Sequence, residues 1–291
     1  MNVQHVPVML KEVTEMLQPQ HDGIYIDATV GLGGHAEAIL QRSGGCVLIG
    51  IDRDEMALEI SRERLGNYSD VHLVKDKFSN MKGVAEDLGF NSVNGILLDA
   101  GISTMQLKAE DRGFSFVKAE TLDMRMDQSQ EFTARDVVNK YPEKKLADII
   151  WKYGEERFSR KIARAIVYAR KKKTVTSCDE LAGIIERAIG RRGRIHPATR
   201  TFQAIRIEVN KELDELSAAV ESGAELLQKG GRFCVLSYHS LEDRIIKNAF
   251  KKLAKDGLFI IITKKPLVPC REEERSNPSS RSAKLRVGEK I

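Results

Sequence analysis

The feature that most constrains the fold is a regular alternation of strand-like and helix-like segments in the first hundred residues. Short runs rich in Val, Ile and Leu are separated by segments with helical periodicity. The expected strands are 24–27, 46–52, 71–74 and 95–99, and the expected helices are 36–42, 55–65 and 81–88. Strands that alternate with helices of this length predict βαβ units, in which a parallel sheet is buried on both faces.

The alternation stops after residue 107, and strand patterns return only beyond residue 206. The helical patterns in between include 144–151, 159–172 and 178–189. The later expected strands are 231–237, 258–263 and 283–287. We therefore predict an α/β fold with a mostly parallel seven-stranded sheet in residues 1–107 and 206–291, interrupted by an inserted α-helical subdomain in residues 108–205.

The basic residues are concentrated in one stretch, 157–206, which lies in or beside the predicted insertion. This stretch contains 14 Lys and Arg but only three acids, a net charge of +11, whereas the whole chain carries +5, so the remaining residues are net acidic. Such segregation is typical of a surface for a polyanion, although a solvated basic helix face has the same composition. The candidate contacts to a polyanion are Arg170, Lys171, Lys172, Lys173, Arg191, Arg192 and Arg194.

Composition excludes several classes of protein. No run approaches the roughly 20 apolar residues of a membrane-spanning helix, and the N-terminal residues lack the pattern of a secretion signal. The cysteines are scattered and have no metal-ligand spacing. We therefore expect free thiols, no metal site, and a cytoplasmic protein without a membrane partner. A homodimer is compatible with the sequence.

A glycine-rich turn follows the first expected strand and reads Asp27–Ala–Thr–Val–Gly31–Leu–Gly33–Gly34–His35–Ala36. Glycines allow a sharp backbone turn and bring the N–H groups of a following helix close to a ligand. Asp52 ends the second strand at a distance suited to ribose hydroxyls, and Asp99 ends the fourth. A turn that serves only strand–helix packing is the alternative.

Two cofactor classes fit this arrangement. A nicotinamide dinucleotide would place its pyrophosphate on the turn, and the spacing Gly31-x-Gly33-x-x-Ala36 satisfies its fingerprint. Asp27 lies four residues before Gly31, where a carboxylate would repel a pyrophosphate but attract the ammonium group of S-adenosylmethionine. The sequence therefore favours a methyltransferase over a nicotinamide-dependent oxidoreductase.

Further segments form an ordered set along the chain. Besides the glycine turn they are His5–Val–Pro–Val–Met–Leu10, Ile51–Asp–Arg–Asp54, Leu98–Asp–Ala–Gly–Ile–Ser103, Asp111–Arg–Gly–Phe–Ser–Phe116, Asp123–Met–Arg–Met126, Arg200–Thr–Phe–Gln–Ala–Ile–Arg206, Ser237–Tyr–His–Ser–Leu–Glu–Asp–Arg244 and Asn277–Pro–Ser–Ser–Arg–Ser–Ala–Lys–Leu–Arg286. With these segments the chain resembles, nearly end to end, the bacterial 16S ribosomal RNA cytosine-N4 methyltransferases of the RsmH (MraW) family.

The resemblance implies a Rossmann-like, S-adenosylmethionine-dependent methyltransferase core with a helical insertion. It implies methylation of the exocyclic N4 of a cytidine, expected at nucleotide 1402 in the decoding region of 16S rRNA, with the rRNA or small ribosomal subunit as partner. The family's fourth-strand loop commonly has a proline where this chain has Met105. The implied cofactor-binding residues are Gly33, Gly34, His35, Asp52, Phe78, Asp99 and Gln106.

Methyl transfer to an amine is an in-line displacement in which the protein supplies mainly alignment and electrostatics. Cytosine N4 is a poor nucleophile because its lone pair is delocalised into the ring, so acceptors for its N–H groups would help. We expect Asp99 to fix the cofactor and Ser103 to accept from the amine, although Ser103 could equally cap a turn. The Pro-Pro-aromatic loop of many amino-methyltransferases is absent, which disfavours a DNA amino-methyltransferase.

Three aromatic side chains have structural interpretations that compete with functional ones. His239 could orient the substrate, but a structural histidine is favoured. Trp151 and Tyr153 are expected in the core rather than as platforms for base stacking. A non-catalytic ribosome-assembly factor is the remaining alternative, although the intact glycine turn and its acids argue against a degenerate site.

Overall fold

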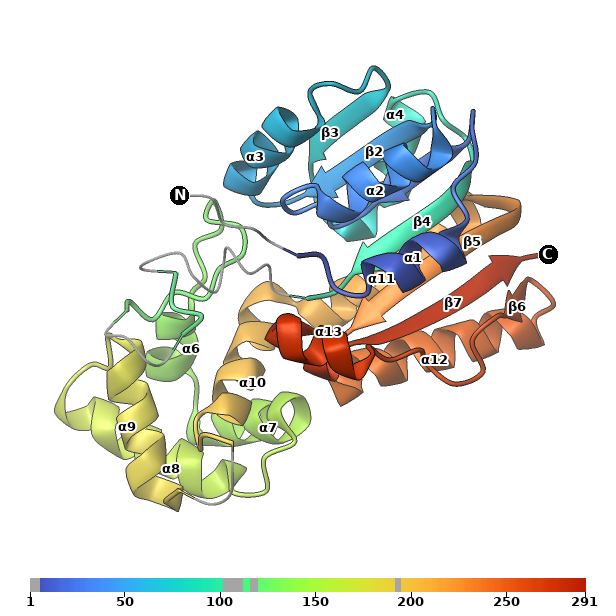
Figure 1. Ribbon diagram of the computed structural model, residues 1–291. Helices are drawn as coiled ribbons and strands as arrows, with labels where there is room; N and C mark the ends of the chain where they lie inside the picture. The colour runs from blue at the N-terminus through green and yellow to red at the C-terminus, as the bar shows by residue number, and fades with distance from the viewer. Residues whose placement is uncertain (1–5, 102–111, 116–119, 192–194) are drawn as a thin grey trace. The chain divides into compact units, whose positions relative to one another are not determined.

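The computed structural model describes residues 6–101, 112–115, 120–191 and 195–291, and it divides into two compact units (Figure 1). One unit comprises residues 1–102 and 213–291, and the other comprises residues 103–212. The later boundary lies beyond the expected residue 205. Helix α10 (Thr199–Asn210) accounts for this difference, because it continues through residue 205 and packs against α7 (Glu143–Gly154) of the helical unit.

The larger unit is built on a seven-stranded sheet in the order β3-β2-β1-β4-β5-β7-β6. The strands are β1 (Ile24–Asp27), β2 (Val47–Asp52), β3 (Val71–Lys75), β4 (Val93–Asp99), β5 (Leu227–Ser237), β6 (Phe259–Ile261) and β7 (Lys284–Lys290). Strands β1 to β5 pair in parallel, and β7 pairs antiparallel with β5 and β6. The predicted mostly parallel, seven-stranded α/β core is confirmed.

Helices cover both faces of this sheet. They are α1 (Leu10–Leu17), α2 (Gly34–Ser43), α3 (Glu55–Leu65), α4 (Met81–Asp87), α11 (Glu212–Leu226) and α12 (Ser240–Lys255), with the short α13 (Arg271–Ser276) and the 3-10 segments η1 (Phe78–Asn80) and η2 (Pro278–Ser282). Successive strand residues point to opposite faces. Ile26 and Leu98 therefore pack with α4, α11 and α12, whereas their neighbours Tyr25 and Leu97 pack with α1, α2 and α3.

The strand order reverses direction at β1 and β4, whose carboxyl ends lie side by side. From β1 the chain crosses to β2 on one side, whereas β4 pairs with β1 on the other side. Where connections leave in opposite directions, the loops diverge and leave room for a ligand at the carboxyl edge. The acids that end β1, β2 and β4 all lie at this edge.

The smaller unit is helical and has its own apolar core. Its helices are α6 (Ala134–Lys140), α7, α8 (Ser159–Lys172), α9 (Cys178–Ile189) and α10. Each helix contributes buried residues, such as Val137, Ile150, Ile162, Ile185 and Ile205. Amphipathic helices are stabilised by burying one such stripe against their neighbours. Across the described ranges, no helix combines the length and the apolar character needed to cross a bilayer.

Candidate active site

Three carboxylates meet at the carboxyl edge of the sheet. Asp27, Asp52 and Asp99 are the last residues of β1, β2 and β4. They lie close enough together that the charges of Asp99 and Asp52 both act on Asp27. The structure therefore brings together three acids that lie far apart in the sequence, beside the glycine-rich turn.

Asp27 is buried, with 1% of its surface exposed, and one of its two carboxylate oxygens has no hydrogen-bond partner among the described residues. Its Oδ1 accepts a hydrogen bond from Thr29 N at 3.2 Å, whereas Oδ2 has no hydrogen-bond partner among the described residues. Burial raises the pKa of Asp27 to about 7. The hydrogen bond from Thr29 N opposes this shift, and the charges of Asp99 and Asp52 add to it. A buried carboxylate with an open acceptor is suited to a cationic group.

Asp52 ties the end of β2 to the glycine-rich turn. Its Oδ2 accepts from Gly31 N and its Oδ1 accepts from Asp54 N, each at 2.9 Å. Burial raises the pKa of Asp52, and these two backbone N–H groups oppose the shift. Each carboxylate oxygen has more than one lone-pair site, so the side chain that shapes the turn keeps acceptor capacity for a ligand hydroxyl.

The turn depends on backbone conformations that favour glycine. Gly31 and Gly33 have φ values of 51° and 77°, in the left-handed region. A Cβ on Gly33 would also lie 3.2 Å from Ser61 Oγ, which donates to Gly31 O at 2.7 Å. Gly33 is the N-cap of α2, and the first N–H groups of a helix have no partner within it. The turn therefore presents backbone donors beside the carboxylates.

The His35 side chain is directed toward the protein itself. Its Nε2 donates to the carbonyl oxygen of Val8 at 2.9 Å, and the side chain is buried. Burial lowers the pKa of His35, opposed by the charge of Asp99 and by the Val8 contact. The imidazole thus anchors the N-terminal segment, while the backbone of His35 lies at the start of α2.

Phe78 begins η1, shortly after β3. Its ring packs against the apolar cluster that contains Ile26 and Leu98, and the Arg53 guanidinium carbon lies 5.5 Å from its centroid. Arg53 directly follows Asp52 in the chain, so the ring and the ribose-binding candidate lie in one neighbourhood. The sequence pattern indicates the aromatic ring but not Arg53, whose position over the ring depends on the pairing of β2 with β3.

Asp99 has a partner, Tyr238, that the sequence pattern does not indicate either. The Tyr238 phenol forms a hydrogen bond with the Asp99 carboxylate, and burial, followed by the charge of Asp99, raises the pKa of Tyr238 well above its usual value. The phenol therefore stays protonated and donates. A Cβ on Gly101 would lie 2.6 Å from Tyr238 Cε2, so the ring packs directly on this glycine. The available signal was a tyrosine just after the strand that pairs with β4.

His239 caps a helix, which is the structural role that the sequence favoured. It is the N-cap of α12, and its Nδ1 accepts from Glu242 N at 3.3 Å. The Glu242 carboxylate in turn accepts from the backbone N of Tyr238 at 2.8 Å and of His239 at 3.2 Å. This reciprocal capping box holds the segment that carries Tyr238.

Four predicted site residues lie outside the described residues. They are Ser103, Gln106, Arg192 and Arg194. Their assigned roles stay predictions.

Three of the described basic candidates have partners within the protein. The contacts are Arg170 with the Val138 carbonyl at 2.7 Å, Lys173 with Glu180 at 2.8 Å and Arg191 with Glu186 at 2.5 Å. Burial also lowers the pKa of Arg170, whose side chain is the least exposed of the three. Arg170 therefore stabilises the helical unit itself.

The other two described candidates, Lys171 and Lys172, are exposed at the end of α8. Lys172 Nζ lies 4.5 Å from the ring centroid of Tyr168, which is 63% exposed. A cation over an exposed aromatic ring one helical turn away forms a compact surface feature. It combines charge with a flat apolar face.

The expectation that Trp151 lies in the core is wrong. Trp151 is 61% exposed, whereas Ile150 beside it is fully buried. Successive helix residues are rotated by about 100°, so the face of α7 that buries Leu146 and Ile150 turns Trp151 outward. Tyr153 is partly buried and packs against the core of the helical unit, as expected.

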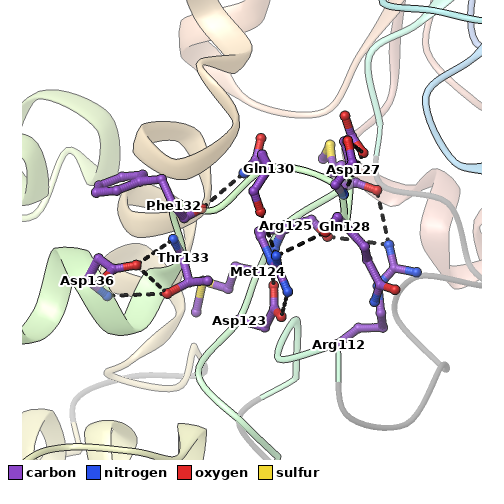
Figure 2. Close-up of polar contacts among 12 residues, drawn as sticks. Arg112, Asp123, Met124, Arg125, Asp127, Gln128, Gln130, Phe132, Thr133 and Asp136 are labelled. Atoms are coloured by element: carbon purple, nitrogen blue, oxygen red, sulfur yellow. Dashed lines mark hydrogen bonds and ion pairs between the residues drawn. The ribbon is translucent and has the colours of Figure 1, made fainter.

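Figure 2 shows the segment 123–126 of the helical unit, one of the motifs that carried the family resemblance. Arg125 donates to the Asp123 carboxylate through Nε and Nη2, each at 2.8 Å, and through Nη1 to the Gln130 carbonyl. Arg112 Nη2 donates to a carbonyl of the same segment at 3.1 Å. The charged groups of this motif are used inside the protein, so they stabilise its loop.

The edge of the sheet thus combines four chemical features. It has a buried carboxylate with an open acceptor (Asp27), a carboxylate suited to hydroxyls (Asp52), a glycine turn with backbone donors, and a partly exposed ring (Phe78). A ligand with a cationic end, a sugar and a planar base matches these features. A dinucleotide pyrophosphate does not, because it would meet Asp27.

Comparison with known proteins identifies a family and similar relatives. The model of the MraW methylase family matches residues 2–291. A relative from Sulfurihydrogenibium sp. (strain YO3AOP1), described as "Ribosomal RNA small subunit methyltransferase H", is 50% identical over 99% of this chain and 100% of its own length. One of the same description from Caldicellulosiruptor bescii is 47% identical over 99% of both chains.

A solved structure from Clostridium thermocellum has the same fold. It superposes with a TM-score of 0.51 at 12% sequence identity and covers 99% of this chain and 100% of its own. At that identity the likeness concerns the fold alone.

Proposed function

The chain belongs to the MraW methylase family, and on that basis we propose that it is an S-adenosylmethionine-dependent methyltransferase acting on the N4 amino group of a cytidine in 16S rRNA, expected at nucleotide 1402. The relatives' description supports small-subunit ribosomal RNA as the substrate. Within the structure, the proposal depends most on Asp27, a buried carboxylate with an open acceptor beside a glycine turn. An rRNA substrate would place the enzyme in the cytoplasm.

Each part of the sheet edge suits one part of the cofactor. When bound, S-adenosylmethionine supplies an electrophilic methyl group on a sulfonium. Asp27 receives the ammonium end, Asp52 accepts from the ribose hydroxyls, and Phe78 lies beside the adenine. Gly33 and Gly34 form the start of α2, where the first N–H groups of the helix can donate to the cofactor. His35 takes part through its backbone, since its side chain binds Val8.

Asp99 has the central position among the residues that we assign to catalysis. Tyr238 donates to its carboxylate and Gly101 N donates to Oδ1 at 3.3 Å, so the side chain is held in one orientation. A fixed carboxylate at the end of β4 orients the cofactor without reorganisation during the reaction. Ser103 follows Asp99 by four residues and remains our candidate acceptor for an N–H of the N4 amine. A hydrogen-bond acceptor at this position favours a pyramidal nitrogen.

The first test separates this function from the alternatives by ligand and product. We expect calorimetric titration to give binding of S-adenosylhomocysteine and none of NADH. Mass mapping of 16S rRNA from cells with and without the protein should then differ by a methyl group on one decoding-region cytidine. Binding of NADH would indicate an oxidoreductase, and an unchanged cytidine with normal cofactor binding would contradict the assigned substrate.

The outward face of α8 is the surface that we assign to RNA. Its exposed residues follow helical spacing, so they form one stripe opposite the buried Ile162 and Ile166. The stripe consists of Arg160, Lys161, Arg164, Tyr168, Lys171 and Lys172, and the exposed Arg157 precedes the helix by two residues. Among the described residues only Arg164 in this stripe has an acidic partner, Glu143 at 3.7 Å. Uncompensated cations around an exposed ring suit a phosphate backbone and an unstacked base.

Neutralising this stripe should weaken RNA binding and its salt dependence while cofactor binding stays intact. The slope of log K against log salt is negative, and each lost phosphate contact reduces its magnitude by about 0.7 to 0.9. We therefore expect the triple variant Lys161→Gln, Lys171→Gln, Lys172→Gln to make the slope shallower by about 2. The matched control, Lys247→Gln, Lys251→Gln, Lys252→Gln, removes the same charge from exposed positions on α12. Filter binding at several salt concentrations measures both. Equal slopes for the two triple variants would place the RNA elsewhere.

A further inference from the structure

The segment 6–9 lies across the start of α2, directly after the glycine turn. A Cβ on Gly34 would be 2.4 Å from Pro7 Cγ, so the proline ring packs directly on this glycine. One residue further, the Val8 carbonyl accepts from His35 Nε2 at 2.9 Å. We call residues 6–9 the N-terminal strap. It forms one side of the region where α2 presents its first N–H groups.

The strap is held by a segment from the other end of the chain. Glu273 Oε1 on α13 accepts from Met9 N at 2.6 Å, across 264 positions of sequence. At the outer end, Asn277 Nδ2 donates to the Val6 carbonyl at 3.0 Å. Two side chains near the C-terminus thus bind both ends of a four-residue segment.

Met9 is the part of the strap that most needs this support. Its φ is 52°, in the left-handed region that a non-glycine residue rarely adopts, and its side chain is fully buried. A residue keeps such a conformation only when its surroundings impose it. The carboxylate of Glu273, bound to the N–H of this same residue, is a contact of that kind.

Glu273 also lies close to the carboxylate site. Burial dominates the lowered pKa of His35 and the raised pKa of Tyr238. The charge of Glu273 acts on both groups: it opposes the lowering at His35 and adds to the raising at Tyr238. His35 begins α2, and Tyr238 binds Asp99. The residue that holds the strap is therefore a neighbour of both sides of the assigned cofactor site.

We propose that Glu273 is a positioning residue for the cofactor: by holding Met9, it keeps the N-terminal strap seated on Gly34 and His35 and so completes the wall of the site at the start of α2. The inference rests on the proposed function, because it takes S-adenosylmethionine as the ligand. A seated strap keeps water away from the helix N–H groups, which strengthens their hydrogen bonds to a ligand. The hydrogen-bond acceptor of Glu273 matters here, rather than its charge.

Three variants on α13 test this directly. Glu273→Ala removes the acceptor, whereas Glu273→Gln removes the charge but keeps an oxygen that can accept from Met9 N. Glu272→Ala is the matched control, since it removes an exposed carboxylate from the adjacent position of the same helix. Calorimetry gives the Kd for S-adenosylhomocysteine, and steady-state kinetics with saturating RNA separates kcat from the cofactor KM.

We expect Glu273→Ala to raise the Kd and the cofactor KM about tenfold with kcat retained, as for the loss of one hydrogen bond. For Glu273→Gln, the Kd and the cofactor KM should stay within about twofold of the wild-type values. For Glu272→Ala, both should equal the wild-type values. If Glu273→Ala does not fold, Asn277→Ala releases the other end of the strap and should raise the Kd in its place.

The inference is overturned if both Glu273 variants lose affinity equally, if neither does, or if the loss lies in kcat. A wild-type protein that does not bind S-adenosylhomocysteine would instead contradict the proposed function.

Discussion

Asp27→Asn is expected to abolish the pH dependence of cofactor binding and to leave the affinity weak throughout. With a pKa of about 7, Asp27 is mostly neutral at pH 6 and mostly charged at pH 8. Only the charged form attracts the ammonium group, so the wild-type Kd for S-adenosylhomocysteine should fall about tenfold between these pH values. Asparagine keeps an acceptor for Thr29 N but carries no charge at either pH.

Calorimetric titration at pH 6, 7 and 8 measures this effect. The matched control is Asp87→Asn, which removes an exposed carboxylate at the end of α4 and should retain the wild-type pH profile. A pH-independent wild-type Kd would mean that Asp27 does not receive the cationic end of the cofactor. The same pH dependence in Asp27→Asn would assign it to another group.

Ionisation of Asp27 affects stability and binding in opposite ways: as the pH rises, it strengthens cofactor binding but lowers the free energy of unfolding. Asp27→Asn should remove both effects. The pKa of Asp27 is higher in the folded chain than its usual value of 3.8, so the folded state holds the proton longer. Without ligand, the contribution of Asp27 to the stability of the wild-type protein is therefore lost as the pH rises from about 4 to about 7. Between pH 5 and pH 8 the unfolding free energy of Asp27→Asn should gain about 3 kcal/mol relative to wild type. Urea unfolding of the ligand-free proteins measures it, and a constant difference would contradict it.

Asp99→Ala is expected to reduce methyl transfer to rRNA by at least about 100-fold while the protein stays folded. The substitution removes the acceptor of the Tyr238 phenol and of Gly101 N, and with it the fixed carboxylate at the end of β4. Transfer of labelled methyl groups to small-subunit RNA measures the rate, and thermal unfolding checks the fold.

Two controls define what the loss means. Asp87→Ala makes the same change at an exposed site and should leave the rate unaltered. Tyr238→Phe keeps the ring on Gly101 and removes only the hydroxyl, so we expect a smaller loss, about tenfold. A folded Asp99→Ala protein that methylates at the wild-type rate would contradict the assigned role of Asp99.

Local patterns were enough to predict the sheet and its acids. The alternation of short apolar runs with helical periods depends on neighbouring residues, and the structure has a strand at each of the seven expected places. Since the carboxyl ends of parallel strands meet at one edge, Asp27, Asp52 and Asp99 could be assigned to a common site from their positions alone.

Partner choice could not be predicted in the same way. Lys171 and Lys173 lie in one basic run, yet only Lys173 has a carboxylate within reach, because α9 presents Glu180 to it. Trp151 follows two isoleucines in an apolar run, and only the packing of α7 decides which of these neighbours face inward. Such outcomes depend on elements distant in sequence, which local periodicity does not contain.

The amino-acid sequence by itself determined the family, the alternating α/β core, the glycine turn and the acids at the strand ends, because each depends on short-range spacing or on an ordered set of motifs. Only the tertiary structure decided what these groups contact. It buried Asp27 and left one oxygen without a partner, it placed Tyr238 against Asp99, and it joined Met9 to Glu273. The physical reason is that burial and hydrogen bonding arise between segments that meet only when the chain has folded.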